Sequence, residues 1–140
     1  MEGIRLEKVI EGKGLLTLQF EHNLEEVLKI GTYVDSCVAL GGFNSFNASS
    51  VALDANKQVV FARDAKGKFV ARQVVALSEK HQLLCYDVYF RGGSCDELEK
   101  FFIEYDKRLA SRLGVIICDD CDIEPKRILS SEWYQDCFVV

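Results

Sequence analysis

The pattern of apolar and polar positions predicts three consecutive strands, over residues 57–64, 68–78 and 82–90. The first two stretches alternate apolar and polar side chains and are rich in valine, as is typical of strands in a sheet that helices cover. The third stretch is apolar almost throughout, which predicts a central strand buried on both faces. Asp64 and Gly67 mark a hairpin turn, because a glycine late in the turn accepts the positive φ that this geometry requires.

One long helix is predicted after these strands. Ser94 is expected as its N-cap, and Glu97, three residues later, completes a capping box. Gly114 is expected to end the helix, and residues 115–118 are expected to form a buried strand parallel to the third one. Apolar residues recur between these ends at three- and four-residue spacing, which predicts a broad buried face made of Leu98, Phe101, Phe102, Tyr105, Leu109 and Leu113.

The N-terminal part is predicted to add one strand and one short helix. Residues 14–21 alternate leucine and phenylalanine with polar side chains, which is the pattern of a half-buried strand. Asn23 is expected to cap a short helix, with Glu26 in the capping-box position and Gly31 at the end.

Two stretches are less regular. Residues 32–56 carry paired glycines and several small polar side chains, which is typical of loops that hold a functional site and equally of loops that only turn. A helical turn is expected over residues 48–53. Residues 128–140 contain Trp133 and Tyr134, and we expect them to form a packed, closing strand.

Composition places the chain among globular proteins of one domain, spanning residues 1–140. Hydrophobic residues make up 49% and charged residues 28% of the chain, with one proline. The net charge of −5 argues against nucleic-acid binding, because neutralising phosphates needs a basic face. Neither a membrane span nor a secretion signal is expected, since no apolar run is long enough, and so we expect a cytoplasmic location.

The six cysteines are expected to be reduced thiols in that location. Cys118 and Cys121 form a CxxC pair, but no second pair accompanies it, and zinc sites of this kind need four ligands at suitable spacing. We therefore predict free thiols and no metal site.

The order of elements over residues 14–140, a three-stranded meander, a glycine-bearing loop, a long helix and a parallel strand, resembles the GNAT family of N-acetyltransferases. The resemblance implies an α+β fold with a mixed, mainly antiparallel sheet flanked by helices. In that family the loop's backbone amides hold the pyrophosphate of acyl-coenzyme A, helped by the positive end of the helix. Carried to this chain, the cofactor-binding residues would be Tyr89, Arg91, Gly92, Gly93 and Ser94. The cofactor implied for an enzyme is acetyl-CoA or another acyl-CoA.

The resemblance also implies where catalytic groups would lie. The backbone of residues 87–89 would bind the acyl amide, and Asp87 is the first candidate for a general base. Tyr105 or Tyr134 could protonate the departing thiolate. Asp87 has a structural alternative as the partner of Arg72, and both tyrosines have one as core aromatics with a hydrated hydroxyl.

The loop departs from the family's pattern, which has a glutamine or arginine first, a glycine fourth and a glycine or alanine sixth. Counted from Arg91, the fourth and sixth residues are Ser94 and Asp96. Together with Glu97 and Glu99, Asp96 would make this helix start repel a polyphosphate.

Two functional hypotheses follow. The first is a non-catalytic or degenerate GNAT-like domain that binds a protein or another macromolecule, through an apolar patch expected at Phe43, Phe46, or Trp133 with Tyr134. The alternative is an acyl-CoA-dependent N-acyltransferase with a small-molecule acceptor. The order of elements is common to both hypotheses and does not separate them.

Overall fold

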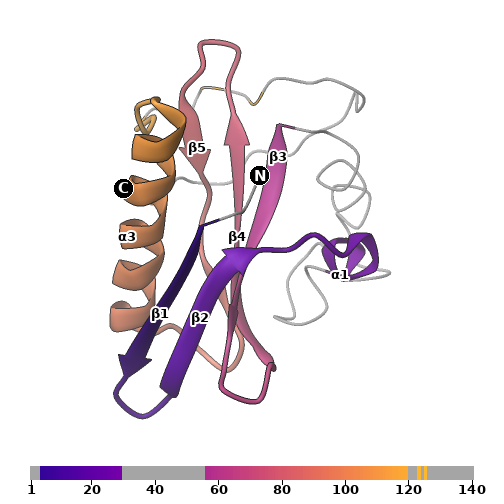
Figure 1. Ribbon diagram of the computed structural model, residues 1–140, viewed down its shortest axis with the longest axis vertical. Coiled ribbons are helices and arrows are strands. Elements are labelled where there is room, and N and C mark those ends of the chain that lie inside the picture. Colours follow the sequence, from indigo (N-terminus) through magenta and orange to yellow (C-terminus); the bar gives the residue numbers. More distant parts are fainter. Residues whose placement is uncertain (1–3, 30–55, 120–122, 124, 126–140) are drawn as a thin grey trace.

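The computed structural model describes residues 4–29, 56–119, 123 and 125, and shows an α+β fold. A curled antiparallel sheet carries a long helix against one face (Figure 1). The strands are β1 (Arg5–Ile10), β2 (Gly14–Phe20), β3 (Lys57–Arg63), β4 (Phe69–Leu77), β5 (Leu83–Cys85) and β6 (Tyr89–Phe90). The helices are α1 (Leu24–Leu28) and α3 (Asp96–Leu113). The sheet order is β1-β2-β3-β4-β5, with β6 also paired to β4. The prediction of an α+β fold with a mainly antiparallel sheet is therefore confirmed.

The first hairpin, β1–β2, contains a strand that the sequence pattern did not predict. Leu6 faces Leu18 across the pair, and Lys8 faces Leu16. Lys8 shares the face of β1 that carries Leu6 and Ile10, but it is half-exposed, and its ammonium group lies 5.7 Å from the centre of the Phe101 ring. A lysine between two apolar residues on that face hides the alternation that reveals a strand.

The predicted hairpin between β3 and β4 is confirmed. Asp64 Oδ1 accepts from the N–H groups of Lys66 and Lys68, each at 2.9 Å, and Gly67 adopts a φ of 78°. An aspartate that holds the turn with its side chain, followed by a glycine at positive φ, fixes the register of the two strands.

The third predicted strand is not continuous. Val75 pairs with Cys85 and Arg72 with Tyr89, so residues 86–88 lie opposite residues 73 and 74. One extra residue on one side is a β-bulge, and it divides the stretch into β5 and β6. The predicted burial on both faces is confirmed for β5, but the central position is wrong because β5 ends the strand order, and β6 is only half-buried. A continuous apolar run contains no signal for such a bulge.

Residues 115–118 make a parallel contact with β5, as predicted, but not a buried strand. Leu83 donates its N–H to the Ile116 carbonyl at 2.8 Å, and Cys118 donates to the Leu83 carbonyl at 2.9 Å. This is a single parallel bridge between Leu83 and Ile117, and the Ile116 side chain is 67% exposed.

Helix α1 begins at the predicted cap. Asn23 accepts from the Glu25 N–H at 3.0 Å, and its own N–H donates to Glu21 Oε1 at 2.7 Å. The helix ends at Lys29. The predicted stop at Gly31, residues 32–55 of the predicted loop with its helical turn at 48–53, and the closing strand at 128–140 lie outside the described residues.

Helix α3 ends where predicted but starts differently. Gly114 at φ 69° caps its C-terminus. The N-cap is Cys95, not Ser94, and no side-chain cap hydrogen bond is present, so the predicted capping box of Ser94 and Glu97 is wrong. The physical reason is the path of the loop: its glycines turn the chain so that Cys95, in an extended conformation, is the residue next to the first helical turn.

The core has two parts, one on each face of the sheet. Helix α3 covers one face with the predicted apolar stripe, except that Leu113 is 42% exposed and so does not belong to it. On the other face Val27 of α1 packs with a second cluster that includes Phe61 and Val74. In Figure 1, α1 and α3 accordingly lie on opposite sides of the sheet.

Candidate functional site

The predicted ligand loop connects β6 to α3 and is open to solvent. Arg91, Gly92, Gly93 and Ser94 are all exposed, and the Arg91 N–H donates to the Val70 carbonyl of β4 at 2.9 Å. Gly92 and Gly93 adopt φ values of 80° and 111°, which a side chain would strain. The sheet therefore fixes the start of the loop, and the glycines turn it toward the helix.

The start of α3 combines two opposing electrostatic features. Its first N–H groups donate no hydrogen bond to an N-cap side chain, and such groups are donors for an anion. The first turn also carries the carboxylates of Asp96, Glu97 and Glu99. A helix N-terminus has a partial charge of about +0.5, whereas these three side chains bring about −3, so the surroundings of the loop are negative.

The bulge at residues 86–88 lies directly before the loop. Gln73 donates from Nε2 to the Tyr86 carbonyl at 3.0 Å, and the Tyr86 N–H donates to Val74 at 3.0 Å. The bulge takes residues 87 and 88 out of the regular pairing with β4, which resumes between Arg72 and Tyr89.

Two candidate residues lie in or beside this bulge. Asp87 is half-buried within it. Tyr89 is also half-buried, and the buried Arg72 guanidinium stacks 4.1 Å above the centre of its ring. The arginine charge is placed against an aromatic face, which is a favourable cation–π arrangement. The expected pairing of Arg72 with Asp87 stays a prediction.

Tyr105 lies away from the loop, on the buried face of α3. Its hydroxyl donates to the Ile4 carbonyl at 3.0 Å and ties the helix to the segment before β1. Burial raises the pKa of this hydroxyl, and the neighbouring Asp106 carboxylate raises it further. In this position the hydroxyl holds the fold together. Tyr134, the other candidate acid, lies outside the described residues.

A buried polar cluster that the sequence pattern did not predict lies beneath α3. Asp106 is 2% exposed, and its Oδ2 accepts from Gln73 Nε2 of β4 at 3.0 Å. The Cys85 thiol of β5 lies beside this carboxyl, and burial raises the pKa of that thiol. The signal was present in the sequence: Asp106 lies between Phe102 and Leu109 at buried-face spacing, and Gln73 occupies an inward position on β4.

A separate ion pair links the start of α1 to the sheet. Arg63 pairs with Glu21, which is almost fully buried, and the Arg63 guanidinium also lies 4.6 Å from the centre of the Phe69 ring. A buried carboxylate needs such a partner. This pair is explained by the fold alone.

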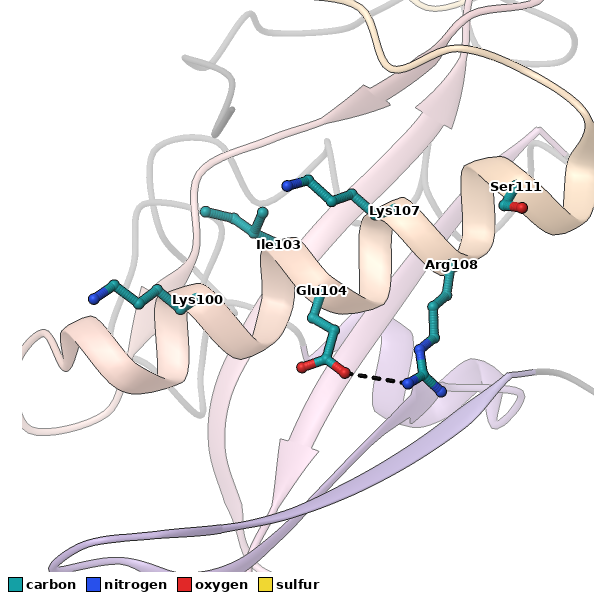
Figure 2. A pocket seen from close by; sticks show the side chains of 6 residues that line it. All are labelled: Lys100, Ile103, Glu104, Lys107, Arg108 and Ser111. Carbon is teal, nitrogen blue, oxygen red and sulfur yellow. Dashed lines mark hydrogen bonds and ion pairs between the residues drawn. The ribbon is translucent and has the colours of Figure 1, made fainter.

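An open groove of about 560 Å³ runs along the outer face of α3. Figure 2 shows the side chains that line it, all projecting from the one helix: Lys100, Ile103, Glu104, Lys107, Arg108 and Ser111. Glu104 and Arg108 form an ion pair at 3.3 Å, one turn apart. Lys107 and Arg108 lie in the second half of the helix, where a positive charge is favourable, whereas Lys100 lies in the first half.

In the part of the chain that the structure describes, no group of three histidine, cysteine or acidic side chains is arranged to hold a metal ion. Cys118 is buried and its CxxC partner Cys121 lies outside the described residues. Neither α1 nor α3 is long and apolar enough to cross a membrane.

Comparisons with known proteins give the chain no relative. No protein-family model, no curated protein and no solved structure matches it. Any assignment of function therefore depends on the geometry of residues 86–99.

Proposed function

We propose that the chain is a GNAT-like domain that acts as a non-catalytic binding module. The meander of β3, β4 and β5, the glycine loop, α3 and the parallel bridge from Leu83 to Ile117 support the likeness to that family. The observation that carries the functional part is the acidic first turn of α3, beside the exposed loop at residues 91–94.

The charge at this loop is unfavourable for a coenzyme A pyrophosphate. Three carboxylates stand in the first turn of α3, and Arg91 is the one basic side chain of the loop. The attraction of a helix N-terminus for an anion is about 0.3–1 kcal/mol at an exposed position, and nearby like charges offset it. The same surface is suited to a protein partner that presents lysine or arginine side chains.

The position of Tyr105 also supports a module without catalysis. Its hydroxyl already donates to the Ile4 carbonyl, and its pKa is raised, so it is a poor proton donor to a thiolate outside the core. Asp87 is half-buried inside the bulge, and in sequence β6 separates it from the glycines of the loop. No pair of described side chains here has the arrangement of an acid and a base.

Acetyl-CoA binding tests the proposal. A ligand at about 1 mM that binds with a Kd of about 10 µM stabilises its protein by about 2.7 kcal/mol, which a thermal unfolding experiment detects readily. We expect no rise in Tm for the wild type. Saturable stabilisation by acetyl-CoA, together with chemical-shift changes at Gly92 and Gly93, would contradict the proposal.

A matched pair of variants tests the electrostatic reason. The variant Asp96→Asn, Glu97→Gln, Glu99→Gln removes the charges beside the loop, and we expect it to gain measurable acetyl-CoA affinity. The control Glu7→Gln, Glu11→Gln removes charges from exposed residues of the β1–β2 hairpin and should gain none. If the neutralised loop also fails to bind, repulsion is not the cause and the loop lacks the required shape.

The alternative function, an acyl-CoA-dependent N-acyltransferase, is favoured by one observation. A bulge interrupts the pairing of residues 86–88 with β4, and the start of α3 has no side-chain cap, which are the places where the resemblance would put an acyl amide and a phosphate. If the wild type binds acetyl-CoA, the first residue to test is Asp87: Asp87→Asn should then lower kcat while leaving acetyl-CoA affinity unchanged.

A further inference from the structure

The buried polar cluster contains an unusual set of hydrogen-bonding atoms. Gln73 uses Nε2 to donate to both the Tyr86 carbonyl and Asp106 Oδ2, each at 3.0 Å, so both of its N–H hydrogens are occupied. Two buried oxygens remain without a hydrogen-bond donor: Asp106 Oδ1 and Gln73 Oε1. They belong to two groups that are already joined by a hydrogen bond.

An ionised Asp106 cannot satisfy these oxygens. A carboxylate only accepts hydrogen bonds, as does the amide oxygen, so two buried acceptors would both lack a donor. A buried acceptor without a donor destabilises the fold, and more so where the group is charged. A single proton on Asp106 Oδ1 changes this, because the acid O–H can then donate to Gln73 Oε1.

We propose that Asp106 is a neutral carboxylic acid in the folded protein, joined to Gln73 by two reciprocal hydrogen bonds, and that this acid–amide pair is a pH-sensitive clamp between α3 and β4. The Gln73 amide donates to Asp106 Oδ2, and the Asp106 O–H donates back to Gln73 Oε1. One proton thereby satisfies both oxygens, and the pair connects the middle of the helix to the middle of the sheet.

The groups around Asp106 contain no cation that would hold it ionised. Gln73 faces it from β4 and the Cys85 thiol from β5, while Tyr105 is its neighbour on α3. No ion pair of Asp106 is present among the described residues. Burial raises the pKa of Asp106 from 3.8 to about 7, although hydrogen bonds from Gln73 and Cys85 lower it in part.

The charged side chains of α3 and β1 near this cluster lie at the surface. The two buried cations, Lys57 of β3 and Arg72 of β4, lie on the opposite face of the sheet, which carries Val59, Phe61 and Val74. On α3, Glu104 is half-exposed, and Lys107 and Arg108 are exposed. On β1, Lys8 pairs with Glu104 at 3.8 Å and is half-exposed as well. The side chains that β2 and β3 contribute to this core cluster are apolar, namely Leu16, Leu18, Phe20, Val60 and Ala62.

The sign of the pH dependence follows from linkage. The folded protein holds the Asp106 proton more tightly than the unfolded chain, whose aspartates have a pKa near 3.9. The stabilisation is fully present below about pH 4, falls as the pH rises, and its loss is complete above about pH 7. Between these limits the unfolding constant grows about tenfold per pH unit through this group.

The test compares wild type, Asp106→Asn and Glu104→Gln by urea unfolding from pH 5 to pH 8. The amide that replaces Asp106 can donate to Gln73 Oε1 and accept from Gln73 Nε2, and it does not titrate. The ratio of the wild-type to the Asp106→Asn unfolding constant should therefore rise on the order of a hundredfold over this range. Glu104→Gln, a half-exposed carboxylate two residues away on the same helix, should leave the wild-type pH dependence unchanged.

A second measurement needs no substitution. In protein labelled with ¹³C at aspartate, the Asp106 carboxyl signal should titrate with a midpoint near 7, far above that of the other aspartates. A carboxyl that is ionised throughout the range above pH 5 would overturn the proposal. So would an Asp106→Asn variant whose loss of stability relative to wild type is larger at pH 8 than at pH 5.

Discussion

Helix α3 carries the same chemical group in two opposite environments. At its start, Asp96 and Glu97 stand in water beside an exposed loop. Three turns later Asp106 lies against β4, where it accepts a hydrogen bond from the uncharged Gln73 amide. In water a carboxylate keeps its charge at little cost, whereas in a core without a cation the neutral acid is favoured.

The exposed and the buried carboxyl groups of α3 have different roles. The exposed carboxylates act on what approaches the loop, by repelling anions and attracting cations. The buried carboxyl acts on the fold, by holding α3 against the sheet while it is protonated. Both are acidic residues in sequence, so composition and net charge alone do not distinguish them.

The largest expected effect comes from breaking the buried pair. Gln73→Leu leaves Asp106 and the Tyr86 carbonyl without their donor, and we expect it to destabilise the protein by about 2–4 kcal/mol at pH 8. Urea unfolding measures this directly. The double variant Gln73→Leu, Asp106→Leu removes both polar groups and should recover much of the loss, because two apolar partners need no hydrogen bond. A double variant less stable than Gln73→Leu alone would contradict this account.

The exposed carboxylates are expected to behave in the opposite way. Asp96→Asn with Glu97→Gln removes favourable interactions with the helix N-terminus, so it should destabilise by about 0.3–1 kcal/mol per residue. Salt screens exposed charges, with a Debye length of about 3 Å at 1 M, so this loss should shrink when unfolding is repeated at high salt. The effect of Gln73→Leu should not shrink in the same way. If salt reduced the two losses of stability equally, the proposed difference between exposed and buried carboxyl groups would be contradicted.

Much of the fold could be predicted because the local patterns agree with the tertiary contacts. The β3–β4 hairpin follows from Asp64 and Gly67, and the end of α3 from Gly114. Strand β1 was missed because Lys8 lies between two apolar residues on one face of the strand. The bulge was missed because an apolar stretch reads the same whether or not one residue is extra.

The sequence predicts only the part of the candidate site whose residues are consecutive in the chain. The residues of the loop are consecutive, so the sequence brings Arg91, Gly92 and Gly93 together without any fold. The cluster of Gln73, Cys85 and Asp106 joins three elements, and its members are meaningful only once β4, β5 and α3 are packed. Polar residues at positions that periodicity assigns to the core are the signal to search for.

The smallest expected effect concerns the N-cap at the start of α3. If Cys95 is the N-cap, Cys95→Ser introduces a hydroxyl that can accept from the N–H groups of the first turn, and the helix should gain about 0.5–1 kcal/mol of stability. Ser94→Ala should then change stability by less than about 0.5 kcal/mol, since Ser94 caps nothing. Both differences can be measured by urea unfolding at one pH. A loss of about 1 kcal/mol in Ser94→Ala, without a gain in Cys95→Ser, would place the cap at Ser94 and return the first N–H groups to its side chain. In that case the loop would offer an anion no free donors from the helix start, and the carboxylates would not be needed to explain weak coenzyme binding.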